Sequence, residues 1–381
     1  MFRIEMLPAG HGDSLLISYG EPDAPHYILI DGGPYYFYAN KSKKELGKHQ
    51  KLRHRLGQLA RSGAKLELMV VTHIDGDHIE ALVKWIGSQP KTLPFKDLWF
   101  NGRQHLESGW LGVPEGEFLA KLIAMHKLPW NKKFDGDAVV CHPDHVVKKS
   151  LTGGMKLTIL SPSRENLVKL RTEWDDVLEE EKLDTDDPEA ILERLGKNKR
   201  LRPEPLAVGW LGEEVDVDQL ADAEFDEDAT APNGSSIAFL AEYQDKAVLF
   251  TGDAHPSTLI TSISQLLRER HLSSLPLDAF KIPHHGSRNN LNNDLLKLLE
   301  CRRYLISTNG SYYHHPDREV IARILKYGAL EYSKNSFDKA EVCFNYHKPR
   351  VAVWDDPDLK FRYQYETRFP DQSGDALVID L

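Results

Sequence analysis

Four potential metal ligands lie within six residues of the chain, at His73, Asp75, Asp77 and His78. They directly follow the apolar segment at residues 66–71, which predicts a buried strand. Because Gly76 permits a tight turn, this short segment can direct all four side chains toward one point. Four ligands are more than one catalytic ion usually takes from a single turn while keeping an open position, so the pattern favours two cations. The alternative is a polar loop in which Asp and Gly serve only the turn, and it accounts poorly for two histidines flanking two aspartates.

Strand and helix patterns alternate in both halves of the chain. The apolar runs predict strands at residues 2–7, 13–20, 26–33, 66–71, 97–101, 155–160, 235–243, 247–253, 277–285 and 302–310, with three late ones at 340–346, 350–354 and 376–380. The expected helices are residues 42–61, 79–87, 115–127, 163–182, 256–270 and 291–300, and one that begins at Arg318. Two halves of this kind predict an α/β chain in which two β-sheets are sandwiched between helices.

The middle of the chain is less regular and strongly acidic. The 381 residues suffice for one large domain with insertions, and we expect a single domain over residues 1–381. Residues 100–230 are expected to contain an insertion, with an acidic and partly flexible part at 183–230 where a protein partner could bind. The formal net charge is −10, but much of the acidity lies at residues 175–189 and 213–228. The total charge therefore does not exclude a nucleic-acid substrate.

The sequence gives no sign of a membrane span or a secretory signal. Its apolar runs are strand-sized, well below the roughly 18 to 20 residues that a membrane-spanning helix needs. The first residues lack a basic region followed by an apolar core. Cys141, Cys301 and Cys343 are widely spaced, which suits a reducing compartment. We therefore expect a cytoplasmic protein that does not bind membranes, and the sequence does not indicate its oligomeric state.

Several short motifs occur in a fixed order and together resemble the metallo-β-lactamase superfamily. H-I-D-G-D-H at 73–78 is similar to the superfamily signature H-x-H-x-D-H, with Asp75 in place of the second histidine. This variant resembles the ComEC-type subgroup, named for the hydrolase domain of bacterial DNA-uptake channels. The further motifs are G-H-G-D-S-L-L-I (10–17), I-L-I-D-G-G (28–33), N-G-S-S-I (233–237), L-F-T-G-D (249–253), K-I-P-H-H-G-S (281–287) and H-P-x-x-E-V (315–320). The resemblance implies a metallo-β-lactamase αββα sandwich with a metal site at one edge, between the two sheets.

The resemblance also implies a ligand set for two divalent ions, zinc or manganese. His73 and Asp75 would hold the first ion, Asp77 and His78 the second, and Asp253 would bridge both. One of His284 and His285 would complete the ligand set of the second ion, while the other would contact the substrate or the ligands. His285 is favoured as the ligand because it immediately precedes the Gly286 turn. The superfamily's usual third histidine is absent, and Asn233 or Ser235 lies near its position.

The ligand set favours phosphoester chemistry. Asp75 is a harder ligand than imidazole and shifts the preference toward oxygen-loving ions such as manganese. Two neighbouring cations can activate a water molecule and stabilise the oxygens of a phosphoryl centre. The ComEC-type resemblance then implies a nuclease acting on DNA or RNA, so the expected substrate is a nucleic acid or a nucleotide. Two alternatives remain: hydrolysis of a small phosphoester or cyclic nucleotide, and a partner-binding protein with an accessory or inactive hydrolase core.

Other polar residues are candidates near this site. We expect one of His284, His285 and His315 to assist the leaving group by proton transfer, although His315 could equally belong to a structural loop. Asp31 and Asp13 could each orient a ligand histidine or simply form part of a turn. His11 could approach the site from the first turn, but a position at the surface is the favoured expectation. The resemblance cannot identify the substrate, because one fold hosts many reactions.

Overall fold

Two β-sheets face each other in the computed structural model, which describes residues 1–35, 52–88, 93–105, 114–181, 215–310, 313–336, 338–371 and 375–381. Within these ranges, the first sheet has the order β16 (Leu377–Asp380), β1 (Phe2–Met6), β2 (Leu15–Glu21), β3 (Ala24–Ile30), β4 (Leu66–Val70), β5 (Leu98–Trp99). The second has the order β15 (Tyr365–Arg368), β14 (Ala340–Phe344), β13 (Arg303–Ile306), β11 (Ala279–Lys281), β9 (Lys246–Phe250), β8 (Ala238–Tyr243), β7 (Lys156–Ser161), β6 (Val147–Ser150). β10 (Leu275–Leu277) and β12 (Leu299–Cys301) form a separate parallel pair.

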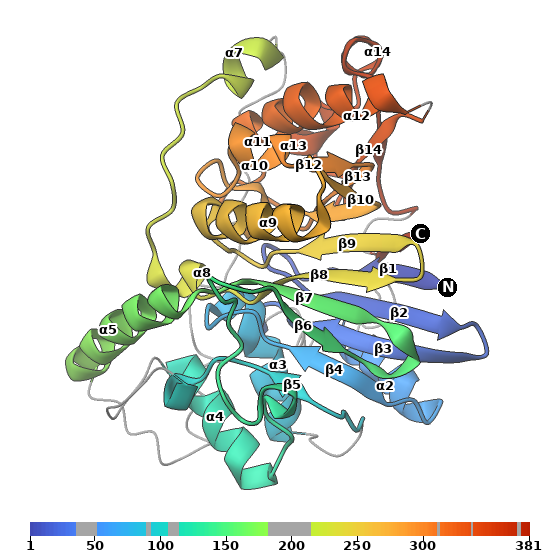
Figure 1. The fold of residues 1–381 in the computed structure, drawn as a ribbon. Helices are drawn as coiled ribbons and strands as arrows, with labels where there is room; N and C mark the ends of the chain where they lie inside the picture. Colours follow the sequence, from blue (N-terminus) through green and yellow to red (C-terminus); the bar gives the residue numbers. More distant parts are fainter. Residues whose placement is uncertain are drawn as a thin grey trace.

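Helices lie outside both sheets. Figure 1 shows the first group on the side of the first sheet: α2 (Leu52–Arg61), α3 (Gly76–Ser88) and α4 (Pro114–His126). The second group lies on the side of the second sheet: α9 (Pro256–Arg270), α10 (Asn293–Lys297), α11 (Arg318–Arg323) with its π-helical continuation η6 (Ile324–Ala329), α12 (Leu330–Asn335), α13 (Pro349–Ala352) and α14 (Pro357–Tyr363). The remaining helices are α5 (Arg164–Glu181), α7 (Val217–Ala221) and α8 (Ala231–Gly234). None of the described helices combines the length and the apolar character that crossing a membrane requires.

Alternate side chains of each strand build separate apolar layers on the two faces of a sheet. In β3, Ile28 and Ile30 pack into the layer between the sheets together with Val248 of β9. Leu29 points the other way and belongs to the layer that contains Leu56 of α2. The outer layer of the second sheet joins β9, α9 and α11 through Leu249, Ile263 and Ile321. This burial confirms the α/β class and the αββα sandwich expected from the sequence.

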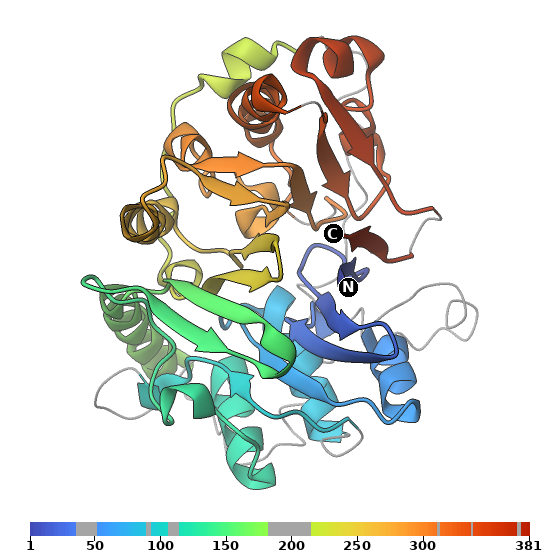
Figure 2. The ribbon, with the colours of Figure 1, turned by 45° about the vertical axis from the view of Figure 1, so that its right-hand side comes forward.

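Parallel strand pairs bring several strand ends to one edge between the sheets. β3 and β4 are parallel in the first sheet, and β9 and β11 are parallel in the second. The segments that leave the carboxyl ends of these four strands therefore meet. The last strand, β16, pairs with the first, β1, so that the two termini lie close together in both views (Figures 1 and 2). The motifs around Asp31, His73, Asp253 and His285 all follow these strand ends.

The described elements agree with most of the predicted ones, and the exceptions have physical reasons. The prediction of a strand at 350–354 is wrong, because Pro349 begins the short helix α13 there. β15 was not predicted, since its sequence YETR has a single large apolar residue. The acidic residues 182–214 and the start of the expected helix at 42–61 lie outside the described residues.

Candidate metal centre

A turn and a helix start deliver the first group of polar side chains. After β4 the chain runs through Thr72 and His73, and α3 begins at Gly76. Asp77 and His78 therefore lie in the first turn of a helix, where an acidic side chain is favoured by the helix dipole. The sequence predicted a tight turn at Gly76, but there Gly76 opens the helix instead. The neighbouring G-H-G-D segment packs against this turn so closely that a Cβ at Gly12 would lie 1.9 Å from the Asp77 carbonyl oxygen.

Asp253 lies at the centre of the cluster, just after β9. Its Oδ2 is 3.3 Å from Nε2 of His78 and 3.8 Å from Nε2 of His73, His284 and His285. The side chains of His73, His78 and His285 are almost completely buried, whereas 22% of the His284 side chain is exposed. One carboxylate oxygen thus faces four imidazole nitrogens at the edge between the sheets.

The two remaining carboxylates lie on either side of this centre. Asp75 Oδ2 is 3.6 Å from His73 Nε2. Asp77 Oδ2 is 3.1 Å from His285 Nε2 and 3.9 Å from His78 Nε2. Among the described residues, two groups have the mutual spacing of metal ligands: His73, His78 and Asp253 in one, and Asp13, His78 and His285 in the other.

The donor set fits divalent cations. Nε2 of His73 and Oδ1 of Asp253 are buried and have no hydrogen-bond partner among the described residues. The Nε2 atoms of His78 and His285 are only 3.2 Å apart, and two imidazole nitrogens facing each other need a proton or a cation between them. Imidazole nitrogen and carboxylate oxygen are the donors that zinc, manganese and iron accept in proteins. The residues present therefore fit one or two such ions.

The electrostatics of the cluster favour bound positive charge. Burial by itself would raise the pKa of Asp253, but the imidazoles of His78, His284 and His285 lower it well below its ordinary value. Burial would likewise lower the pKa of His285, yet Asp253, Asp13 and Asp77 raise it to about 10. The Asp253 carboxylate is therefore ionised at neutral pH, and His285 holds a proton that a metal ion would displace.

Outer hydrogen bonds fix the far nitrogen of each buried histidine. His78 Nδ1 donates to Asp31 Oδ2 at 2.8 Å, and His285 Nδ1 donates to the Ser307 carbonyl at 2.9 Å. His73 Nδ1 lies 3.0 Å from Thr72 Oγ1, whose hydroxyl donates to Asp31 Oδ2. With Nδ1 as the protonated nitrogen, each ring presents the lone pair of Nε2 to the centre. Asp31 therefore orients a histidine and is more than a turn residue.

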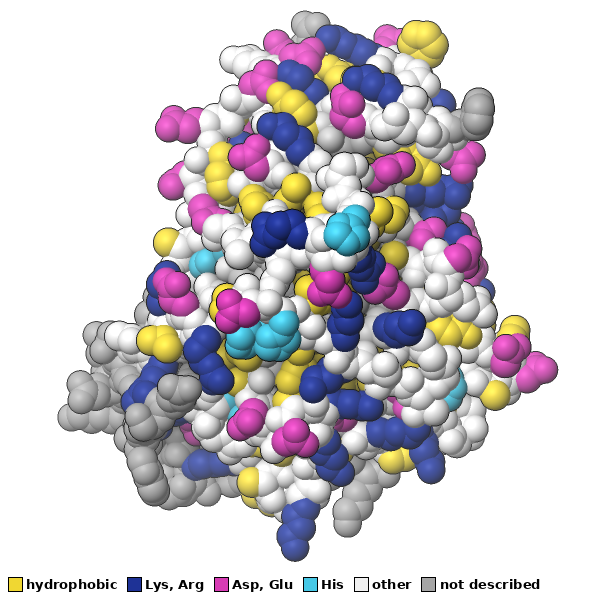
Figure 3. Space-filling view, in the orientation of Figure 1, with side chains coloured by type: hydrophobic (Ala, Val, Ile, Leu, Met, Phe, Trp, Pro, Cys, Tyr) yellow, Lys and Arg dark blue, Asp and Glu magenta, His cyan; other side chains and the backbone are white. Residues whose placement is uncertain are grey.

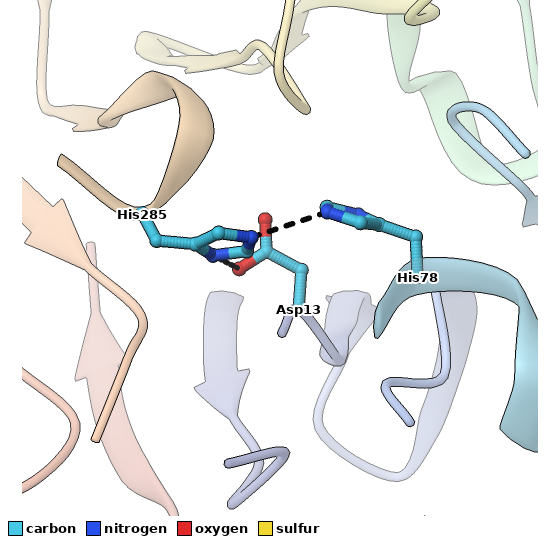
Figure 4. A group of neighbouring side chains, drawn as sticks. All are labelled: Asp13, His78 and His285. Atoms are coloured by element: carbon cyan, nitrogen blue, oxygen red, sulfur yellow. Dashed lines mark hydrogen bonds and ion pairs between the residues drawn. The ribbon is translucent and has the colours of Figure 1, made fainter. Parts of the chain in front are cut away.

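A second buried ion pair lies behind His285. Asp13 Oδ2 is 2.6 Å from Nζ of Lys281, and both side chains are almost fully buried. Asp13 Oδ1 is 3.4 Å from Nδ1 of His285. Figure 4 shows Asp13 between His78 and His285, with one carboxylate oxygen directed at the Nδ1 side of His285. Because Lys281 already neutralises this carboxylate, we regard Asp13 as an outer partner of His285.

The loop at 313–317 contributes a rim of aromatic rings next to the cluster. The ring centroids of His315 and His284 are 5.4 Å apart, and the ring of Tyr313 stacks on that of His315 with centroids 6.0 Å apart. Burial lowers the pKa of His315, although Asp317 opposes the shift.

The expectation that His11 lies at the surface is wrong, because its side chain is buried and lies close enough to Asp77 for the charge of that carboxylate to affect the pKa of His11. Sequence reasoning also missed the roles of Lys281, Asn290 and Ser307, because each role depends on side-chain contacts that exist only in the folded chain.

The sequence matches no protein-family model and no curated protein. Among solved structures, it is similar to a mutant of the β-hydroxylase CmlA, with 13% identity and a TM-score of 0.39, covering 100% of this chain and 54% of that one. CmlA from Streptomyces venezuelae, a diiron β-hydroxylase, gives 12% identity and a TM-score of 0.42 over 99% of this chain and 54% of that one. This chain thus spans about half the length of CmlA. The metallo-β-lactamase fold protein YhfI from Bacillus subtilis gives 9% identity and a TM-score of 0.38, covering 99% and 98%.

Replacing Asp31 by asparagine tests the orienting role. The amide would present N–H donors to Nδ1 of His78 or to the Thr72 hydroxyl, so His78 would lose the partner that fixes its tautomer. We expect divalent-ion affinity to fall about 10- to 100-fold, the usual effect of losing an outer hydrogen bond to a metal ligand. The measurement is competition with a fluorescent chelator.

Asp97→Asn is the matched control, because Asp97 is also buried and accepts backbone N–H groups, but at the amino end of β5, away from the cluster. We expect it to lower stability without changing metal affinity. Equal metal affinity in Asp31→Asn and the wild type would show that Asp31 has only a structural role.

Proposed function

We propose that this chain is a two-metal phosphodiesterase, and that its substrate is DNA or RNA. The observation that carries the proposal is the position of Asp253, whose single Oδ2 lies within 3.8 Å of four imidazole nitrogens, with Asp75 and Asp77 on either side. Such an arrangement suits two adjacent cations that share one carboxylate. On the basis of the sequence motifs, we also propose that residues 1–381 form a single domain with a ComEC-type hydrolase core.

The proposed ligands divide into two sets that share Asp253. His73 and Asp75 would hold the first ion, and Asp77, His78 and His285 the second. His285 is the better second-ion ligand of the histidine pair, because its Nε2 is 3.1 Å from Asp77 Oδ2 and its Nδ1 is already bonded to Ser307. Either zinc or manganese suits this mixture of nitrogen and carboxylate donors, with the carboxylates favouring manganese.

When bound, two such ions activate a water molecule and stabilise the attacking and leaving oxygens of a phosphoryl centre. The chain's own contribution is to fix the ligands through Asp31, Ser307 and Thr72. His284 and His315 lie at the more exposed side of the cluster, where a phosphodiester would enter. A phosphoryl oxygen next to His315 would favour its protonated form, so that it could donate a proton to the leaving oxygen.

The surface away from the cluster does not by itself select nucleic acid. On the face drawn in Figure 3, lysine and arginine side chains alternate with acidic ones. Part of the acidic stretch is neutralised within the chain, since Asp222 pairs with Lys326 at 2.8 Å and Asp218 with Arg362 at 2.7 Å. This weakens the alternative of a partner-docking segment at residues 215–230, and residues 182–214 lie outside the described part.

The test is cleavage of labelled single- and double-stranded DNA and RNA with manganese, zinc or magnesium. We expect metal-dependent cleavage that falls at least about 1,000-fold in Asp77→Ala His78→Ala, since the ions supply several kcal/mol to the transition state. The matched control is His142→Ala His145→Ala. It removes two neighbouring imidazoles, with ring centroids 4.1 Å apart, that are outside the proposed ligand set. We expect it to leave the cleavage activity unchanged.

Two other outcomes would redirect the proposal. Hydrolysis of bis(p-nitrophenyl) phosphate or a cyclic nucleotide, without cleavage of nucleic acid, would identify a small-phosphoester hydrolase. Protein shown to contain two ions that hydrolyses none of these substrates would contradict the phosphodiesterase proposal and favour a partner-binding role.

A further inference from the structure

We infer that His284 is a ligand of the first ion and supplies a second nitrogen donor beside His73; the inference rests on the proposed two-metal function. The second ion has four proposed protein ligands, counting the shared Asp253. The first has only His73, Asp75 and Asp253. The superfamily's usual third histidine is absent, and Asn233 or Ser235 lies near its position.

His284 occupies the space between Asn233 and the shared carboxylate. Its Nε2 is 3.8 Å from Asp253 Oδ2, the same distance as Nε2 of His73. On the opposite side of the ring, Nδ1 lies 3.4 Å from Asn233 Nδ2. The His284 imidazole therefore lies between Asn233 and Asp253, with Nε2 directed toward the Asp253 carboxylate.

The far nitrogen of His284 is held as firmly as those of the other histidines. Nδ1 donates to Asn290 Oδ1 at 2.9 Å and lies 3.6 Å from Asp228 Oδ2. Asp228 in turn accepts from Asn233 Nδ2 at 2.6 Å and from Asn290 Nδ2 at 3.0 Å. A carboxylate and an amide that fix Nδ1 are the usual outer partners of a metal-bound imidazole, because they leave the lone pair of Nε2 free.

The backbone explains how two adjacent histidines reach the same carboxylate. In an extended strand, neighbouring side chains point to opposite faces. Here His284 has φ 45° and ψ 50°, and His285 has φ 55° and ψ 14°. Two successive left-handed residues other than glycine are unfavourable and are kept where the function requires them. Their effect is that both Nε2 atoms lie 3.8 Å from Asp253 Oδ2.

The test is metal stoichiometry and affinity in the full-length protein. Wild type and His284→Ala are stripped, reloaded with Mn²⁺ or Zn²⁺, and analysed by elemental mass spectrometry and chelator competition. We expect two ions in the wild type and one retained ion in His284→Ala, with the other bound at least about 100-fold more weakly. Mn²⁺ electron paramagnetic resonance gives a second readout, since a coupled pair in the wild type should become the signal of an isolated ion.

Two further variants make the result specific. Asn290→Ala removes the partner of His284 Nδ1 but not the ligand, and we expect it to weaken binding of the first ion about 10- to 100-fold. The effect on the second ion should be smaller, because Asn290 reaches it only through its hydrogen bond to the backbone carbonyl of the shared Asp253. This variant tests the inference even if His284→Ala does not fold. His315→Ala removes the neighbouring imidazole and should retain both ions.

The outcomes separate this inference from the proposed function. Two ions bound with unchanged affinity in His284→Ala, together with reduced cleavage, would overturn the inference and assign His284 to the substrate. A wild-type protein that binds no ion pair would overturn the two-metal function itself. One lost ion in His284→Ala without phosphodiester cleavage by the wild type would support the ligand but contradict the proposed reaction.

Discussion

Asp253→Asn is expected to reduce the affinity for both ions and to lower metal-dependent phosphodiester cleavage by at least about 1,000-fold. Among the carboxylates that the structure describes, only that of Asp253 faces both His73 and His285, at 3.8 Å from each Nε2. Asparagine keeps the size of the side chain but removes the negative charge that both ions would share. The backbone should stay in place, because the Asp253 N–H donates to Ser236 Oγ and its carbonyl accepts from Asn290.

The measurement pairs metal content with initial cleavage rates in the same preparations. Asp245→Asn is the matched control: it is the same substitution in the turn between β8 and β9, where 82% of the side chain is exposed. It should keep both ions and full activity. If Asp253→Asn retains both ions with wild-type affinity, then Asp253 is not a bridging ligand and the proposed division of the ligands is wrong.

The proximity of these polar side chains was predictable because the information for it is local. His73, Asp75, Asp77 and His78 are adjacent in sequence, and Asp253 directly follows an apolar strand. Strand ends converge at the edge of a sandwich whatever the details of packing, so the residues that follow them were expected to meet. The alternation of Ile28, Leu29 and Ile30 between two apolar layers follows from the same strand periodicity.

Contacts between distant segments were not predictable from the single sequence. By sequence Lys281 resembles a surface residue, but it is buried because Asp13, in the loop before β2, and the Ile282 carbonyl both bind its ammonium group. His11 was expected to be exposed, yet the G-H-G-D segment packs under the start of α3 and buries it. The roles of Asp228 and Asn290 likewise depend on the left-handed backbone of His284. Each of these features depends on tertiary contacts, which no periodic pattern in the sequence predicts.

Lys281→Ala is expected to lower the free energy of unfolding of the metal-free protein by about 3–5 kcal/mol, the usual effect of removing one partner of a buried ion pair. The Asp13 carboxylate is 2.6 Å from Lys281 Nζ, with only 2% of its side chain exposed. Burial alone would raise the pKa of Asp13, but Lys281 and His285 lower it well below its ordinary value. Without Lys281, a buried carboxylate would lose its main counter-charge and its hydrogen-bond donor.

Chemical denaturation in the presence of a chelator measures this effect without the contribution of bound metal. Lys246→Ala is the matched control, since its ion pair with Asp278 at 3.2 Å is partly exposed and should contribute no more than about 1 kcal/mol. The double variant Asp13→Asn Lys281→Met removes both charges, so it should recover much of the lost stability. A Lys281→Ala protein as stable as Lys246→Ala would mean that water or His285 compensates Asp13. The buried pair would then serve the orientation of His285 and not the stability of the fold.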